Sequence, residues 1–164
     1  MTSLRIVCLG EGMVEERVAA DGAITRWHGG DMLNVAIHLA RLVGQVALAS
    51  ALGTDAQSDA LLRAWRAEGV DTALVLRDPR RRAGRYRIAV DLAGERSFTY
   101  DRADSAARAM FASVDAGWRE AVAGADLLVF SLISLAILPE AGREALIELA
   151  RTVRGRSGLV AFDG

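Results

Sequence analysis

The sequence predicts an α/β protein with a mainly parallel sheet covered by helices on both faces. Short apolar runs rich in Val, Ile and Leu alternate along the chain with stretches of helical periodicity. The chain has 164 residues, 52% of them hydrophobic, so it can bury one sizeable core, and one domain is the expectation. Two pairs of shorter segments interrupt this pattern and predict a separate, small antiparallel sheet over the strand ends.

The first core strand is predicted at residues 4–9, an apolar run that Gly10 ends. The acidic residues that follow it lie at the carboxyl end of a strand, where open α/β sheets bind ligands. A hairpin is predicted from residues 18–20 and 24–27, because the Asp-Gly pair between them supplies the positive φ of a tight turn.

A helix is predicted from the diglycine Gly29-Gly30 to Gly44, with Asp31 as its N-cap and Gly44 as its stop. Asn34 lies in its first turn, beside two residues that have no side chain. Backbone donors, a helix N-terminus and an amide side chain are therefore within reach of one bound molecule. The alternative is a helix entered through a flexible turn, with Asn34 bonded to its own backbone, and the spacing alone does not decide between the two.

The remaining elements follow in the same alternation. The second core strand is expected at residues 46–51, followed by a turn at 52–55, and the helix at 56–68 has Leu61 and Trp65 on its apolar face. The further predictions are a strand at 73–76, helices at 103–109, 114–122 and 139–153, and core strands at 126–131 and 159–162.

A second hairpin is predicted from residues 86–90 and 96–100, which flank a turn at 92–95. Both segments alternate polar and apolar residues, so one face of this pair is polar and half-exposed.

Composition and charge limit the kinds of molecule that the protein is expected to bind. The formal net charge is −1, and the only run of like charge, Arg80-Arg81-Arg82, is interpreted as a solvated loop, so neither a nucleic-acid nor a membrane partner is expected. The single cysteine, Cys8, is predicted to be a small buried hydrophobe. His28 and His38 have no metal-ligand spacing, and no metal site is predicted.

The cytoplasm is the expected compartment. The first apolar run is too short for a signal peptide, no stretch reaches the length of a membrane span, and a lone cysteine fits a reducing compartment.

The helix from Gly29 to Gly44 resembles the N-terminal signature of the ribokinase family of sugar kinases. The shared features are the diglycine, Asn34 and the closing glycine; Met32 and Val43 depart from the usual pattern. Further stretches resemble the 2-keto-3-deoxygluconate kinases of that family in order and spacing, with departures at Gly12 and Asp101. These stretches are residues 10–13, 51–55, 94–102, 106–107 and 133–138.

The resemblance implies a ribokinase-like three-layer α/β/α fold with a small β lid. Residues 1–164 would form the N-terminal part of one such domain, with lid strands near 15–28 and 84–101. The implied activity is transfer of the ATP γ-phosphate to 2-keto-3-deoxygluconate. Another sugar kinase of the fructose or ribose type, or a non-catalytic sugar-binding or dimerisation module, remains an alternative. The lid strands would also permit a homodimer.

The resemblance implies substrate-binding roles for six residues. Gly29, Gly30 and Asn34 would bond sugar hydroxyls from the floor of the site, Tyr86 and Tyr100 would reach down from the lid, and Arg102 would bind the carboxylate. A bidentate guanidinium suits a carboxylate on physical grounds as well. Without the family, the two tyrosines are interpreted as ordinary cross-strand aromatics, and Arg102 as a surface partner of Asp104 or Glu95.

The resemblance places the chemistry outside this sequence. No catalytic residue is expected among the 164 residues, and the sites for ATP and Mg²⁺, with the aspartate that takes the hydroxyl proton, would lie beyond Gly164.

Overall fold

A six-stranded parallel sheet organises the fold in the computed structural model, which describes residues 4–19, 21–91 and 94–164. The strands run in the order β10-β9-β1-β4-β5, and β6 pairs with the second half of β4. All the described pairings within this sheet are parallel, as predicted. The strands are β1 (Ile6–Leu9), β4 (Val46–Gly53), β5 (Val70–Asp71), β6 (Val75–Asp78), β9 (Leu127–Ser131) and β10 (Leu159–Asp163).

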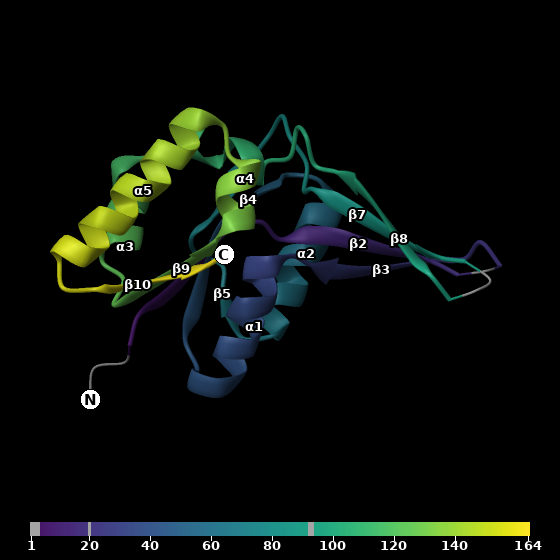
Figure 1. The fold of residues 1–164 in the computed structure, drawn as a ribbon, viewed down its shortest axis with the longest axis horizontal. Helices are drawn as coiled ribbons and strands as arrows, with labels where there is room; N and C mark the ends of the chain where they lie inside the picture. The colour runs from purple at the N-terminus through teal and green to yellow at the C-terminus, as the bar shows by residue number, and fades with distance from the viewer. Residues whose placement is uncertain (1–3, 20, 92–93) are drawn as a thin grey trace.

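Helices cover both faces of this sheet, which gives the three predicted layers (Figure 1). Alternate residues of β1 divide between two cores: Val7 and Leu9 face α3 and α5, whereas Ile6 and Cys8 face α1 and α2. The helices are α1 (Asp31–Val43), α2 (Ala56–Ala67), α3 (Ala116–Ala123), α4 (Leu132–Ile137) and α5 (Glu140–Gly155), with a 3₁₀-helix η1 (Ala107–Ala112).

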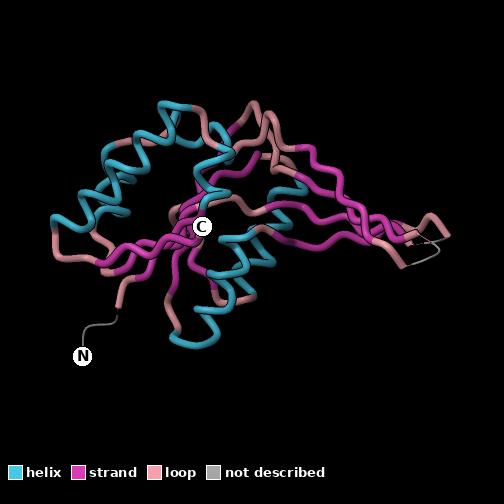
Figure 2. The backbone as a smooth tube through the Cα atoms, viewed as in Figure 1, coloured by secondary structure: helices cyan, strands magenta, loops and turns pink. Residues whose placement is uncertain are grey.

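Four strands form a second sheet, called the small sheet below, in the order β3-β2-β7-β8. They are β2 (Met13–Val18), β3 (Ile24–Gly29), β7 (Arg85–Val90) and β8 (Arg96–Asp101). The small sheet extends away from the helical layers (Figure 2). The prediction of a wholly antiparallel sheet is wrong in one pairing, because β2 and β7 run parallel. The chain leaves the first hairpin, builds α1 to β6 and returns in the same direction, so β2 and β7 join two hairpins side by side.

The hairpin turns lie close to their predicted places, and the strands are longer than predicted. Gly22 and Gly94 adopt φ of 82° and 85°, the conformation that favours glycine. β2 begins at Met13 instead of residue 18, because its Glu15 and Glu16 do not read as strand residues in the sequence. The parts of the predictions that concern Ala20, Leu92 and Ala93 lie outside the described residues.

Other predictions about the elements also need correction. The strand predicted at 73–76 is β6, shifted to 75–78, and the short strand β5 at 70–71 was not predicted; the two pair with successive parts of β4. Gly53, expected in a turn, is the last residue of β4. The helix expected at 103–109 starts later and is the 3₁₀-helix η1, and the apolar helix α4 was not predicted. A capping box between Ser131 and Ser134 begins α4 directly after β9. In the sequence the apolar residues of α4 look like a continuation of the strand, so this helix start is hard to recognise.

Cys8 is fully buried, as predicted, and burial raises the pKa of its thiol to about 12. Of the helices in the described ranges, none combines the length and apolar composition that crossing a membrane requires.

Candidate functional site

A cavity of about 230 Å³ lies where the carboxyl end of β1 meets the small sheet. β1 is flanked by β4 on one side and β9 on the other, so the strand order reverses there, and open α/β sheets bind ligands at such reversals. Of the six residues predicted to bind substrate, five line this cavity and Gly29 lies beside it. The lining consists of Glu11, Met13, Gly30, Asp31, Asn34, Tyr86, Phe98, Tyr100, Arg102 and Ile133.

Gly30 and α1 form the floor of the cavity. Gly30 is the N-cap of α1 with φ 131° and ψ 141°, and its carbonyl oxygen accepts a hydrogen bond of 2.9 Å from Asn34 N–H. A Cβ on Gly30 would overlap the carbonyl oxygen of Glu11. The prediction of Asp31 as N-cap is wrong, because the chain enters the helix through a conformation that only glycine adopts readily. Asp31 is instead the first residue of α1, and its carboxylate accepts a hydrogen bond from the Ser131 hydroxyl.

Tyr86 and Tyr100 cover the cavity from the small sheet. They lie directly opposite each other on β7 and β8, with ring centroids 5.9 Å apart. They are thus a cross-strand aromatic pair, and both also line the cavity. The Tyr86 hydroxyl donates to the Glu15 carboxylate, and burial together with this bond raises the pKa of Tyr86 above its usual range. A Cβ on Gly29 would overlap the same hydroxyl, so the absence of a side chain at Gly29 leaves the space that the Tyr86 ring and hydroxyl occupy.

Arg102 lies at the side of the cavity, between Tyr100 and Glu11. Its guanidinium carbon is 5.1 Å from the centroid of the Tyr100 ring, and its Nη1 is 3.5 Å from Glu11 Oε2. The alternative interpretation, a surface pair with Asp104 or Glu95, is wrong because the described ion-pair partner of Arg102 is the buried Glu11, while Asp104 accepts a hydrogen bond of 2.9 Å from Arg81. Arg81 also pairs with Asp78 at 3.2 Å, so this part of the arginine run is held in place and is not simply a solvated loop.

Glu11 is the main site residue that sequence reasoning missed. It directly follows Gly10 at the end of β1, it is only 1% exposed, and Ser105 Oγ donates to its Oε1 over 2.8 Å. Burial raises the pKa of Glu11, although the Ser105 hydrogen bond and the nearby Arg102 charge act in the opposite direction. The available signal was a charged residue placed directly after an apolar strand, at the edge where ligands bind.

Two further glutamates of β2 are also buried. Glu15 meets Tyr86 on the cavity side of the small sheet, and Glu16 points to the other side. Glu16 is 1% exposed and pairs with Arg26, Arg85 and Arg87, at 3.0, 3.8 and 2.9 Å. The hydrogen bond from Arg87 is the main cause that lowers the pKa of Glu16. Glu16 therefore ties the three strands β3, β2 and β7 together.

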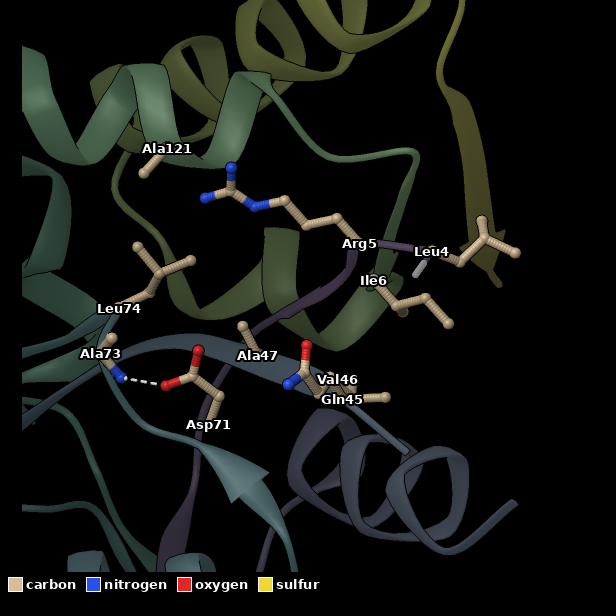
Figure 3. A pocket seen from close by; sticks show the side chains of 10 residues that line it. All are labelled: Leu4, Arg5, Ile6, Gln45, Val46, Ala47, Asp71, Ala73, Leu74 and Ala121. Carbon is tan, nitrogen blue, oxygen red and sulfur yellow. Dashed lines mark hydrogen bonds between the residues drawn. The ribbon is translucent and has the colours of Figure 1, made fainter. Parts of the chain in front are cut away.

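A larger cavity of about 570 Å³ lies at the opposite edge of the main sheet (Figure 3). The Arg5 side chain extends across it toward Ala121, and Asp71 accepts a hydrogen bond of 2.8 Å from Ala73 N–H. This edge holds the amino ends of β1 and β4, and the cavity contains none of the predicted site residues. It is not the favoured ligand edge of a parallel sheet.

The described residues gather no group of three or more His, Cys, Asp or Glu side chains that could hold a metal ion.

A three-layer α/β/α core, with a cavity between its strand ends and a small sheet, defines the chain as an α/β protein with a candidate small-molecule site. The chain belongs to the pfkB family of carbohydrate kinases, whose family model matches residues 4–163. This finding confirms the predicted family and fold class.

Two curated relatives are 2-dehydro-3-deoxygluconokinases. The protein from Escherichia coli strain K12 is 42% identical over 98% of this chain and 53% of its own length. The protein from Dickeya dadantii strain 3937 is 40% identical over 99% of this chain and 54% of its own length. The crystal structure of a PfkB protein from Polaromonas sp. JS666 is 29% identical, with a TM-score of 0.84 over 97% of this chain and 54% of that chain. The chain thus spans about half the length of the curated relatives it matches.

Proposed function

We propose that the protein phosphorylates 2-keto-3-deoxygluconate, the sugar acid also called 2-dehydro-3-deoxygluconate, with ATP as the phosphoryl donor. The described cavity is its sugar-acid site. The observation that carries this proposal is Arg102, whose guanidinium lines a small cavity and has no exposed carboxylate among its described ion-pair partners. The names of the relatives at 42% and 40% identity support the same substrate.

Each predicted residue has a role that its position supports. Arg102 binds the sugar carboxylate, for which a planar guanidinium offers two parallel donors. Asn34 and the backbone at Gly29 and Gly30 bond hydroxyls from the floor, and Tyr86 and Tyr100 bond them from above. The contribution of these residues to catalysis is to hold the reacting hydroxyl in one place and to keep water away from it.

The phosphoryl donor and its metal bind elsewhere in this proposal. ATP and Mg²⁺, together with the catalytic base, are assigned to the portion of the relatives that these 164 residues do not match. The described residues therefore select the substrate and do not transfer the phosphoryl group.

A coupled assay that follows ADP formation by the full-length protein tests the activity. We expect turnover with 2-keto-3-deoxygluconate that far exceeds turnover with fructose or ribose. Turnover of a neutral sugar with none of the acid would refute the assigned substrate and favour the fructose- or ribose-type alternative.

A non-catalytic sugar-binding or dimerisation module is the second candidate, favoured by exposed aromatic side chains. Trp27 and Phe98 are 59% and 51% exposed, and strand register places them on the same face of the small sheet as Tyr86. A second copy of the chain is the proposed occupant of that face. Calorimetry with the sugar acid and with a non-hydrolysable ATP analogue, together with sedimentation velocity, distinguishes the candidates. Sugar binding and dimerisation without nucleotide binding would support the module.

A further inference from the structure

Glu11 contributes a buried negative charge to the cavity that the proposed function does not use. Its side chain is 1% exposed, and its two oxygens have different partners. Oε1 accepts a hydrogen bond of 2.8 Å from Ser105, whereas Oε2 faces Arg102 Nη1 at 3.5 Å. The second separation is long for a charge-assisted hydrogen bond, so Arg102 retains donors for another carboxylate.

The position of Glu11 is tightly constrained by its neighbours. A Cβ on Gly84 would overlap Glu11 Oε1 and approach Arg102 Cβ to 3.1 Å, so the glycine makes room for both side chains. Ser105 Oγ in turn accepts a hydrogen bond of 3.2 Å from Arg108 N–H. Glu11 therefore cannot turn away easily when a ligand arrives.

The charges that face Glu11 do not balance once an acid is bound. Of the charged side chains that line the cavity in the described chain, Arg102 is the one cation, and Glu11 and Asp31 are the carboxylates. A ligand carboxylate would bring three negative groups to one guanidinium. Like charges gathered around a buried carboxylate favour protonation of one of them.

Resting on the proposed substrate, we propose that Glu11 positions Arg102 and takes up one proton from solvent when the carboxylate of a sugar acid binds Arg102. The proton joins Glu11 Oε2, Oε1 keeps the Ser105 hydrogen bond, and Arg102 directs its donors to the ligand. Asp31 is the less suitable acceptor, because its carboxylate already accepts the Ser131 hydroxyl and its side chain is only half-buried, whereas Glu11 is 1% exposed.

The sign of the pH dependence follows from linkage. Binding of an acid raises the pKa of Glu11 above its value in the free protein, which burial has already raised. The affinity for the acid is therefore highest below the pKa that Glu11 has in the free protein. It falls as the pH rises from that pKa to the higher pKa that Glu11 has in the complex. Above that interval the affinity is constant again and weaker.

Calorimetry of 2-keto-3-deoxygluconate binding, in buffers of different ionisation enthalpy, measures the proton uptake directly. In the wild-type protein we expect uptake of a fraction of a proton up to one, and an affinity that falls by up to about tenfold per pH unit within the interval. In Glu11→Gln we expect no uptake and an affinity that does not depend on pH. Asp104→Asn, which removes an exposed carboxylate paired with Arg81, is the matched control and should keep the wild-type uptake.

Ser105→Ala is a second variant, which keeps the proposal testable even if Glu11→Gln does not fold. Loss of the Ser105 hydrogen bond raises the pKa of Glu11, so the pH interval of falling affinity should move upward. Binding without proton uptake, or uptake that survives in Glu11→Gln and disappears in Asp31→Asn, would overturn the inference while the proposed substrate stands. No binding of the acid to the wild-type protein would overturn both.

Discussion

Replacement of Gly30 by alanine should both destabilise the protein and disturb the floor of the cavity. Gly30 has φ 131° and ψ 141°, and a Cβ there would overlap the Glu11 carbonyl oxygen and approach Gly12 Cα to 3.1 Å. Both contacts are with backbone, which cannot rotate away as a side chain does. Relief therefore requires α1 and the segment after β1 to move apart.

The size of the effect has two parts. A non-glycine residue in this region of φ and ψ carries about 1–3 kcal/mol of backbone strain. The steric overlap adds about 1–3 kcal/mol, typical of an extra methyl group in a packed site. The free energy of unfolding of Gly30→Ala should therefore fall by about 2–6 kcal/mol.

Gly22→Ala is the matched control for this prediction. Gly22 also has a positive φ, 82°, but a Cβ there has no described neighbour within 4 Å, so only the conformational cost of about 1–2 kcal/mol applies. Urea denaturation, followed by tryptophan fluorescence, measures both variants. Equal losses of stability in the two variants would refute the argument that the close approach of backbone at Gly30 matters.

Three further predictions concern the site and the small sheet. Arg102→Ala should raise the Michaelis constant for the sugar acid by about 10- to 100-fold, as expected for loss of hydrogen bonds to a charged group. Arg96→Ala, at the far end of the strand that precedes Arg102, should leave the constant unchanged, and an equal effect of both variants would remove Arg102 from the site. Tyr86→Phe should raise the same constant about three- to tenfold with little change in turnover, and an unchanged constant would show that its hydroxyl serves only Glu15. Glu16 has a lowered pKa, so its contribution to stability is present above the unfolded pKa of about 4.5 and is lost as the pH falls through the folded value. Acid titration of unfolding should therefore give a steeper loss of stability below about pH 4.5 for the wild-type protein than for Glu16→Gln, and equal slopes would contradict the ion-pair role of Glu16.

The sequence was sufficient for the main sheet because its strands and helices carry strong local signals. Buried parallel strands are nearly continuous apolar runs, and the helices over them show the 3.6-residue period. The grouping of Gly30, Asn34, Tyr86, Tyr100 and Arg102 around one cavity was also predictable, although only through the resemblance to a family. Spacing alone left ordinary structural interpretations open for each of them.

The rest depended on contacts between distant parts of the chain. Glu15 and Glu16 do not look like residues of a partly buried strand until Tyr86 and Arg87 lie beside them. Glu11 likewise has no local sign of burial, because its partners Ser105 and Arg102 lie 94 and 91 positions further along the chain. Charged residues are rarely buried without an ion-pair or hydrogen-bond partner, and a single sequence does not show which distant residue is that partner.

The parallel pairing of β2 with β7 means that the small sheet, which covers the cavity, forms through contacts between distant parts of the sequence. The bonds between these strands, from Tyr86 to Glu15 and from Arg87 to Glu16, each join residues 71 positions apart. The contacts within each hairpin are local in sequence. The lining of the cavity, in contrast, is complete only after the helices and strands between the two hairpins have folded. The shape of the cavity therefore depends on the integrity of the core: damage away from the cavity, for example in α2 or β4, should alter it through the pairing of β2 with β7.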